Sequence, residues 1–430
     1  HRDLHSFPTR RSSDLVCPDP SWFVHDRFGL FIHWGIYAAA ARHEWVRNYE
    51  RITNEGYQKY FDHFDPDLYD PNVWAAAAAR AGMKYFVITT KHHDGFCLWD
   101  TQQTDYKATR TPYGRDLIAP MVDAFRAHGL RTGFYHSLID WHHPDFVIDN
   151  CHPQRDDKEF RAAQAHRDQS KYAAYLHAQV RELLTGYGEV DIMWFDFSYP
   201  GPDGKDGDDW QAEKLLRMVR ELAPNIIVNN RTTIAQDLWT PEQFQPREWV
   251  TEGGQRVMWE ACQTLNGSWG YHRDNTNWKS VDLLVRMLVD SVSKGGNLLL
   301  NVGPNARGEF QPEALATLAG IGDWMRLHGR SIYGCSESAY AAPEDCRFTQ
   351  NGNRLYLHFF AWPFNAVHLE GELAQRIEYC QFLHDASEIQ CVHGDPHAKR
   401  HNGPDQVATL KLPIARPRVS VPVIEIFLKD

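Results

Sequence analysis

Residues 191–197 read DIMWFDF, a short apolar run whose last carboxylate, Asp196, stands between Phe195 and Phe197. Its length and its branched and aromatic side chains predict a buried strand that ends at Asp196. A carboxylate in such surroundings needs a partner or a task, because burying an unpaired charge is costly. A helix cap or a salt bridge is the ordinary explanation, so the other strand ends decide whether Asp196 does more.

Six further runs of this kind follow one another along the chain, separated by amphipathic segments typical of helices. This alternation indicates a parallel sheet wrapped by helices, and seven strands in order predict a (β/α)8-like barrel. The predicted strands span residues 28–34, 85–90, 132–137, 191–197, 226–230, 257–261 and 298–302. The pattern does not locate an eighth strand.

Cap and turn residues mark the predicted helices. Asp-Pro-Asn at 70–72 begins one helix, and helices over 114–128 and 312–328 each end at a glycine. Past residue 336 the pattern changes to alternating strands with turn residues between them, which predicts a C-terminal β-sandwich. The strand-like runs are RLYLHFFAW, VHLEG, QVATLKLPI and VPVIEIFL.

We therefore expect a catalytic barrel over residues 17–335 and a β-sandwich over 336–430. The opening HRDLHSFPTRRSSDL has no periodicity and resembles a translated sequencing-library adapter, so we interpret residues 1–16 as a non-native leader. A native targeting segment would have been lost with such a replacement. A periplasmic or secreted location stays compatible with the sequence, and the compartment is undetermined.

Composition excludes several classes of protein. The formal net charge of -11 argues against a nucleic-acid partner, which needs concentrated Lys and Arg. No apolar run reaches the roughly 20 residues that a membrane span requires. The 8 cysteines form no CxxC pair and no zinc-finger spacing, so they do not indicate a redox compartment.

Polar and aromatic residues stand at the ends of most predicted strands. In a (β/α)8 barrel these ends converge on one mouth, where the active site lies. This convergence is the main reason to expect an enzyme and to assign Asp196 a function. The residues are His33-Trp34, His92-His93-Asp94, Tyr135-His136, Trp194-Phe195-Asp196, Asn230-Arg231 and Trp259-Glu260.

If Asp196 is the nucleophile of a retaining glycosidase, a second carboxyl group must lie about 5 to 5.5 Å away to donate and then take a proton. Glu242, Glu248, Glu252 and Glu260 are the candidates, and local sequence does not choose between them. Burial at a predicted strand end would raise the pKa of Glu260, as a proton donor requires. Glu242 lies on a long loop that could reach over a sugar.

Two histidine pairs raise the question of a metal. These are His92-His93 and His142-His143, the second pair lying near Asp140 and Asp145. Adjacent residues on a strand point to opposite faces, so we expect one residue of each pair to point away from the site. No HExxH or comparable motif is present, and we expect no catalytic metal.

Hydrogen bonding to sugar hydroxyls is the better interpretation of the polar strand ends. His33, His92 or His93, and Arg231 are the expected donors and acceptors. Trp34, Trp45 and Trp194 are the expected apolar walls. For each single Trp, ordinary core packing remains the competing explanation.

Ten strings in fixed order extend from about residue 22 to 324, three-quarters of the chain. They are FGLFIHWG, EWV, KHHDGFCLWD, FYHSLIDWHHPD, WFD, NNR, TPEQ, WEAC, SWGY and GGNLLLNVGP. Together they resemble the α-L-fucosidases of glycoside hydrolase family 29. The resemblance implies a (β/α)8-like catalytic domain, a C-terminal β-sandwich, a double-displacement mechanism, no cofactor, and a fucosylated oligosaccharide or glycoconjugate as substrate.

Residue by residue, the resemblance implies that Asp196 is the nucleophile. It places the acid/base at Glu242 of TPEQ, with Glu260 of WEAC as second choice and otherwise as a substrate-binding residue. The other implied substrate-binding residues are His33, Glu44, Trp45, His92, His93, Tyr135, Trp194 and Arg231.

Two other interpretations stay open. One is a sugar-binding protein on a barrel that has lost its activity. The other is a different glycosidase such as an α-galactosidase, because L-fucose and D-galactose share a hydroxyl arrangement. The fucosyl linkage and assembly into a homo-oligomer are also open.

Overall fold

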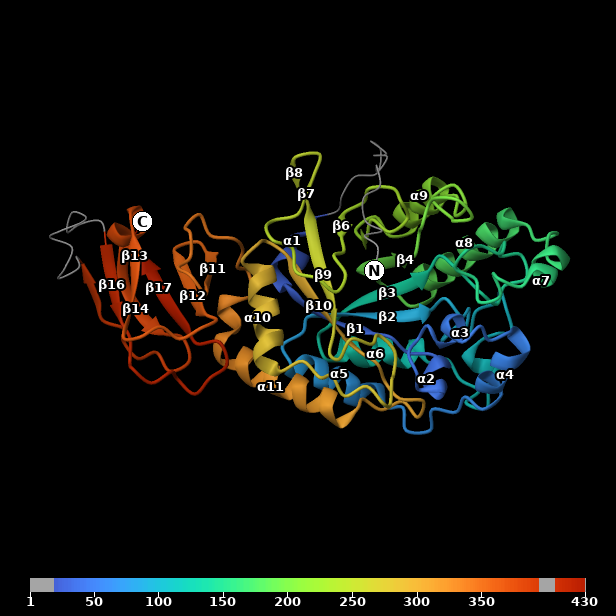
Figure 1. The fold of residues 1–430 in the computed structure, drawn as a ribbon, viewed down its shortest axis with the longest axis horizontal. Helices are drawn as coiled ribbons and strands as arrows, with labels where there is room; N and C mark the ends of the chain where they lie inside the picture. The colour runs from blue at the N-terminus through green and yellow to red at the C-terminus, as the bar shows by residue number, and fades with distance from the viewer. Residues whose placement is uncertain (1–18, 394–406, 430) are drawn as a thin grey trace.

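Eight parallel strands form the first part of the molecule (Figure 1), in the order β5-β4-β3-β2-β1-β10-β9-β6. The computed structural model describes residues 19–393 and 407–429, so the predicted leader over 1–16 lies outside the described residues. The barrel strands are β1 (Phe28–Ile32), β2 (Tyr85–Lys91), β3 (Arg131–Ser137), β4 (Ile192–Asp196), β5 (Ile227–Val228), β6 (Leu238–Trp239), β9 (Met258–Thr264) and β10 (Asn297–Val302).

A single parallel bridge between Asn229 and Leu238 joins the two ends of this sheet and closes the barrel. The eighth strand is thus β6, whose two residues are too few to show a period. The strand predicted over 257–261 ends too early, because the observed strand β9 continues to Thr264. This extension decides the position of Glu260 described below.

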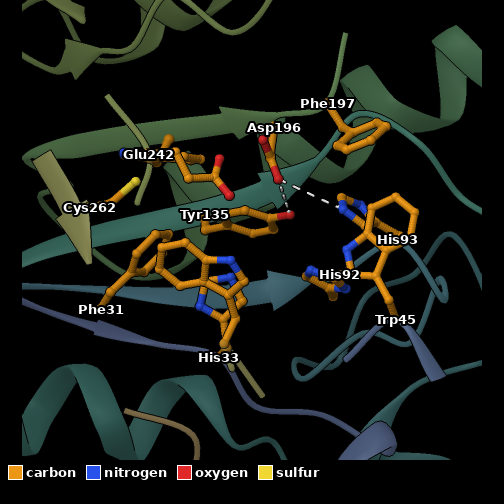
Figure 2. Close-up of a pocket in the computed structure, with 12 residues that line it drawn as sticks. Phe31, His33, Trp45, His92, His93, Tyr135, Asp196, Phe197, Glu242 and Cys262 are labelled. Atoms are coloured by element: carbon orange, nitrogen blue, oxygen red, sulfur yellow. Dashed lines mark hydrogen bonds and ion pairs between the residues drawn. The ribbon is translucent and has the colours of Figure 1, made fainter. Parts of the chain in front are cut away.

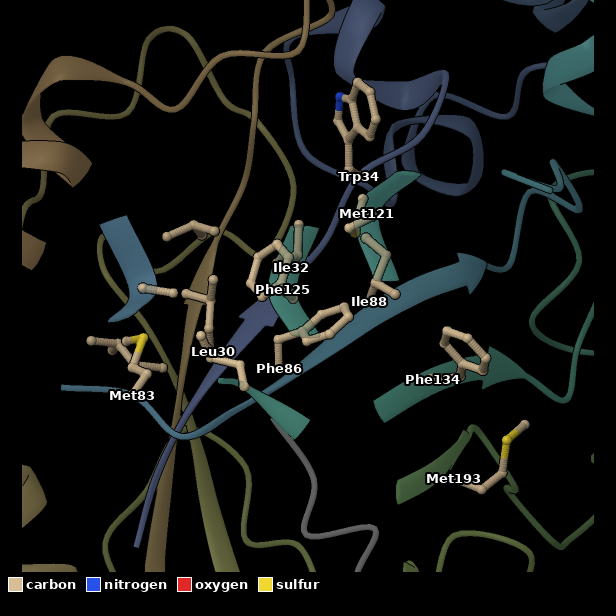
Figure 3. Close-up of a cluster of buried hydrophobic side chains, with 14 of the residues drawn as sticks. Leu30, Ile32, Trp34, Met83, Phe86, Ile88, Met121, Phe125, Phe134 and Met193 are labelled. Atoms are coloured by element: carbon tan, nitrogen blue, oxygen red, sulfur yellow. The ribbon is translucent and has the colours of Figure 1, made fainter. Parts of the chain in front are cut away.

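Strand residues alternate between the inside and the outside of the barrel. Phe31, Tyr135 and Trp194 belong to a cluster inside the barrel. Leu30 and Ile32 face outward and pack with residues of the surrounding helices (Figure 3). Because both faces are buried, the strands are nearly continuous apolar runs, as parallel sheets require.

Helices cover the outside of the barrel, and the predicted caps are present. The Asp70 side chain accepts a hydrogen bond from the backbone of Asn72. The helix predicted over 114–128 begins later, because Asp116 accepts from the backbone N–H groups of residues 118 and 119. The helices are α1 (Ser21–Asp26), α2 (Tyr37–Ala40), α3 (Val46–Tyr49), α4 (Asn54–Asp62), α5 (Pro71–Arg80), α6 (Ile118–Ala127), α7 (Lys158–Ala163), α8 (Gln169–Gly186), α9 (Ala212–Leu222), α10 (Val281–Val292) and α11 (Pro312–His328), with 3-10 turns η1 (Ala108–Arg110) and η2 (Gly329–Ser331).

Two antiparallel sheets follow α11, with orders β11-β12-β17-β14 and β13-β16-β15. Their inward side chains share one core, separate from that of the barrel. The elements are β11 (Cys346–Asn351), β12 (Arg354–Phe359), β13 (Ala366–Glu370), α12 (Glu372–Arg376), β14 (Ile377–Phe382), β15 (Cys391–His393), β16 (Val407–Lys411) and β17 (Val423–Leu428). The expected fold class, a (β/α)8-like barrel followed by a β-sandwich, is confirmed.

A small hairpin of β7 (Thr251–Glu252) and β8 (Gln255–Arg256) projects from the segment between β6 and β9. Within residues 19–393 and 407–429, no helix combines the length and the apolar character that crossing a bilayer takes.

Candidate active site

A pocket opens at the C-terminal ends of the barrel strands, where the sequence predicted the site (Figure 2). Its floor and walls combine aromatic side chains with histidines and two carboxylates. The lining residues are Phe31, His33, Trp45, His92, His93, Tyr135, Trp194, Asp196, Phe197, Glu242, Cys262 and Trp269.

Asp196 ends β4 and is held by partners on both carboxylate oxygens. The Tyr135 hydroxyl donates to Oδ2 at 2.8 Å, and Nη1 of Arg231 donates to Oδ1 at 2.9 Å. Burial raises the pKa of Asp196 to about 6, while the charge of Arg231 opposes that rise. The carboxylate is therefore ionised at neutral pH in spite of its buried position.

The backbone turns sharply after Asp196. Phe197 has φ of +82°, the left-handed region that a bulky residue adopts only under constraint. Its ring lies 5.1 Å from that of Trp45 and 5.0 Å from that of His93. This conformation turns the Phe197 ring into the pocket beside the carboxylate.

Glu242 lines the same pocket as Asp196 and lies on the segment that follows β6. Nη2 of Arg231 donates to its Oε2 at 2.9 Å, so one guanidinium holds both carboxylates. The Arg231 Nε donates to the hydroxyl of Thr240, which fixes the plane of the fork. A parallel bridge joins Glu242 to Cys262 on β9 and positions the segment.

Three histidines line the same pocket. His33 follows β1, and its Nδ1 lies 2.7 Å from Oδ1 of Asn301. His92 and His93 both reach the pocket, so the expectation that one of them would point away is wrong. Strand alternation does not apply there, because β2 ends at Lys91 and the chain turns, with the backbone of Gly95 bonded to that of His92.

Burial keeps these imidazoles neutral. It lowers the pKa of His33 to about 3 and the pKa values of His92 and His93 well below their ordinary value. The pocket therefore offers neutral hydrogen-bonding groups around the Asp196 carboxylate, a set suited to an uncharged polyhydroxylated ligand. His142 does not join them, since its ring stacks on Tyr106 at 3.7 Å.

No cluster of three or more His, Cys, Asp or Glu side chains suited to a metal ion occurs in the described part of the chain.

Some aromatic walls were predicted and others were missed. Trp45 and Trp194 line the pocket as expected. Trp34 does not, because its indole packs against Trp74 outside the barrel and donates to the backbone of Asn305. Sequence reasoning missed four lining residues, although three of them lie in strings that it quoted, FGLFIHWG, WEAC and SWGY. The four are Phe31, Phe197, Cys262 and Trp269.

Glu44 is buried beside the pocket without lining it. Its Oε2 accepts from the backbone of Gly270 at 2.7 Å, which fixes the segment that carries Trp269. Burial raises the pKa of Glu44 to about 8. Its contacts indicate a role in shaping the pocket wall.

Glu260 was predicted to lie at the mouth of the barrel, but the structure places it at the opposite end. It pairs with Asn297 at the first residue of β10, and the Tyr85 hydroxyl at the start of β2 donates to its Oε2. A Cβ on Gly29 would lie 2.2 Å from the Tyr85 ring, so glycine there lets that ring cross the barrel. Glu260 thus lies at the N-terminal end of the barrel interior. We correct its assignment as a substrate-binding residue or acid/base accordingly.

Glu248 and Glu252, the remaining candidates for the second carboxyl group, also lie outside the pocket. Glu248 is exposed, and Glu252 belongs to the projecting β7-β8 hairpin. Glu242 is therefore the candidate that shares the pocket with Asp196.

Comparison with known proteins agrees with this geometry. The family model for α-L-fucosidases matches residues 5–330. The chain belongs to the α-L-fucosidase family. The predicted resemblance to glycoside hydrolase family 29 is confirmed, and the protein is a glycoside hydrolase.

Solved members of the family share the whole fold. α-L-Fucosidase isoenzyme 1 from Paenibacillus thiaminolyticus is 48% identical, with a TM-score of 0.90 over 96% of this chain and 99% of that chain. An α-L-fucosidase from Bacteroides thetaiotaomicron, trapped as a covalent intermediate with 2-fluoro-fucosyl fluoride, is 26% identical with a TM-score of 0.83, over 99% of this chain and 100% of that chain. The α-L-fucosidase of Dictyostelium discoideum is 30% identical over 74% of this chain and 72% of its own length.

Proposed function

We propose that this α-L-fucosidase removes terminal α-L-fucose from oligosaccharides or glycoconjugates by double displacement, with Asp196 as nucleophile and Glu242 as acid/base. The observation that carries the assignment is the Arg231 fork, which donates to both carboxylates at one end of the pocket. Retaining glycosidases need two such groups about 5 to 5.5 Å apart. A shared guanidinium keeps them close and offsets their mutual repulsion.

In the first step, an Asp196 oxygen attacks the anomeric carbon while Glu242 gives its proton to the departing glycosidic oxygen. In the second step, Glu242 takes a proton from water, which attacks the same carbon and releases Asp196. Tyr135 donates to the oxygen of Asp196 nearer to His93, and Arg231 donates to the other. These donors stabilise the carboxylate before attack and after release.

The pocket walls support binding of a single terminal sugar. The barrel interior below the pocket is filled by side chains of its apolar cluster, so a sugar chain has no exit through the barrel. We assign hydroxyl binding to His33, His92 and His93, and apolar contacts to Trp45 and Trp194. The rings of Phe31 and Trp269, 5.9 Å apart, add an apolar surface suited to the methyl group of fucose.

Replacement of the nucleophile tests the proposal. Asp196→Gly should lower kcat for an aryl α-L-fucoside by on the order of 10⁴-fold or more with the fold intact, because no glycosyl-enzyme can form. Added azide should restore turnover and give β-fucosyl azide. Near-normal activity of this variant without added anion would exclude Asp196 as nucleophile.

A further inference from the structure

Among the described residues, the imidazole rings of His33 and His93 each make one hydrogen bond to the protein, and both do so through Nδ1. Nδ1 of His33 lies 2.7 Å from Oδ1 of Asn301, and Nδ1 of His93 lies 2.7 Å from the hydroxyl oxygen of Ser137. Nε2 of His93 lies 3.8 Å from Oδ2 of Asp196, beyond hydrogen-bond distance. Both rings line the pocket, so their Nε2 atoms are the ones available to a ligand (Figure 2).

Counting protons fixes the role of Nδ1 in His93. The Ser137 hydroxyl donates its single proton to the backbone carbonyl of Ile139 at 2.7 Å, and a carbonyl can only accept. The Ser137 oxygen must therefore accept from His93, whose Nδ1 carries the proton.

The same count applies to His33. The Asn301 amide nitrogen donates to the backbone carbonyl of Trp269 at 2.7 Å, which fixes the orientation of the amide. Its oxygen then faces His33 and can only accept, so Nδ1 of His33 carries the proton. Burial lowers the pKa of both imidazoles, so each ring holds one proton and leaves a lone pair on Nε2.

We infer that Ser137 and Asn301 are positioning residues that hold His93 and His33 as Nδ1–H tautomers, so that each Nε2 accepts a hydrogen bond from a sugar hydroxyl. The identity of the ligand rests on the proposed function. A lone pair on Nε2, facing the Asp196 carboxylate, also explains why His93 makes no hydrogen bond to Asp196. A ligand hydroxyl satisfies that lone pair by donating to it.

Nitrogen NMR of the full-length protein tests the tautomers without reference to activity. With ¹⁵N-labelled histidine, two-bond proton–nitrogen correlations distinguish Nδ1–H from Nε2–H rings, and His33→Gln and His93→Gln assign the signals. We expect Nδ1–H rings at both positions in the wild type and a change at His93 in Ser137→Ala. An Nε2–H ring at either position in the wild type, or an unchanged His93 in Ser137→Ala, would overturn the inference.

Kinetics test the consequence. Ser137→Ala should lower kcat/KM for an aryl α-L-fucoside by about tenfold. For the monodeoxy fucoside that lacks the hydroxyl bound by His93, the same substitution should lower kcat/KM much less. Ser137→Thr, which keeps the hydroxyl, should restore activity. Ser331→Ala is the matched control, because Ser331 is a buried serine that donates to the backbone of His328 far from the pocket.

Equal losses in Ser137→Ala for all monodeoxy fucosides would show a merely structural role and overturn the inference. A wild-type enzyme that turns over no fucoside would instead contradict the proposed function, while the NMR result would still decide the tautomers.

An independent observation concerns two cysteines in the β-sandwich. Cys380 on β14 pairs with Ile426, and Cys391 on β15 pairs with Leu410. Directly opposed residues of antiparallel strands share a face, and Ile426 and Leu410 both lie in the sandwich core. The two cysteines therefore point inward from opposite sheets. The backbone N–H of Ile389, two residues before Cys391, donates to the backbone carbonyl of Cys380 at 2.9 Å and holds the two segments together.

We propose that Cys380 and Cys391 form a disulfide that joins the two sheets when a disulfide oxidant such as oxidised glutathione is present. Cys391 is half-buried and Cys380 is fully buried, so Cys391 meets the oxidant first. Its thiolate attacks one sulfur of the oxidant and releases one glutathione. Cys380 then loses its proton, attacks the mixed disulfide at Sγ of Cys391, and releases the second glutathione. The neighbouring Cys380 thiol lowers the pKa of Cys391, which favours the first step.

Thiol counting on the full-length protein tests this proposal. Incubation with oxidised glutathione should remove two of the 8 thiols titrated under denaturing conditions and link the peptides that carry Cys380 and Cys391. Cys391→Ala should abolish the link. Cys346→Ala, which removes another buried thiol of the same core, should not. An unchanged thiol count, a different linked pair, or glutathione retained on Cys391 would overturn the proposal.

Discussion

The Tyr135 hydroxyl lies 2.8 Å from Oδ2 of Asp196 and donates to it, within the barrel interior. Since Arg231 occupies the other oxygen, the ionised form of Asp196 depends on two donors that oppose the effect of burial. The pH at which kcat/KM falls on the acidic side should therefore depend on both donors.

Tyr135→Phe should move the acidic limb of kcat/KM to higher pH. As the proposed nucleophile, Asp196 must be ionised to attack, and its pKa is already raised to about 6 by burial. Loss of the hydroxyl removes a hydrogen bond to the ionised form, so the pKa rises further. We expect the limb to shift by about half a pH unit or more, measured with an aryl α-L-fucoside. An unmoved limb would contradict the role assigned to Tyr135.

Glu242→Ala should slow natural fucosides by about 10²- to 10⁴-fold, and slow substrates with an activated phenolate much less, because such a group departs without a proton. Added azide should give α-fucosyl azide. Glu248→Ala is the matched control, since Glu248 is an exposed carboxylate on the same segment. If Glu242→Ala slowed natural fucosides and activated aryl fucosides equally, Glu242 would not be the acid/base.

An aryl α-L-galactoside should be turned over more slowly than the matching fucoside, by roughly 10- to 100-fold. The two sugars differ by one hydroxyl on C6, and an apolar pocket rejects an added hydroxyl only weakly. Phe31 and Trp269 are the proposed apolar surface. A preference for the galactoside in kcat/KM would show that this surface does not contact the methyl group.

Glu260→Gln should flatten the dependence of thermal stability on pH while leaving activity near that of the wild type. Burial raises the pKa of Glu260 from 4.5 to about 8, so the folded protein holds a proton that the unfolded chain releases above about pH 4.5. Stability is therefore lost as pH rises from about 4.5 through 8. Melting temperatures at pH 5 and pH 8.5 should differ by a few degrees less in the variant. A large loss of activity would instead place Glu260 in the reaction.

Sequence patterns predicted the strands that bury both faces over five or more residues, because such runs differ clearly from helices and loops. They found the two residues of β5 because these lie in the apolar run 226–230, but could not locate β6, whose two residues stand outside any such run. They also ended the strand of Glu260 three residues early. Because position along a strand decides at which end of the barrel a side chain lies, that error led to the prediction that Glu260 lies at the mouth. It lies at the N-terminal end of the barrel.

The site could be predicted where a residue directly ends a strand, as Asp196 does. At His92 and His93, where the chain has already left the strand, strand alternation wrongly predicted that one of the two would point away from the site. Contacts between residues far apart in sequence, such as His33 with Asn301 and Glu44 with Gly270, could not be predicted because only the folded barrel brings these residues together. Trp34 was predicted to line the site because it follows a strand, but it packs against Trp74 in the core outside the barrel.

The barrel is joined between β5 and β6 by one bridge, from Asn229 to Leu238, while most neighbouring strand pairs elsewhere are longer ladders. Glu242 is carried by the segment just beyond this seam. Segments of other lengths could be grafted between residues 240 and 257 while the rest of the barrel keeps its ladders. The same scaffold can thus carry a carboxylate of different reach at this position, while Asp196 on β4 keeps its place.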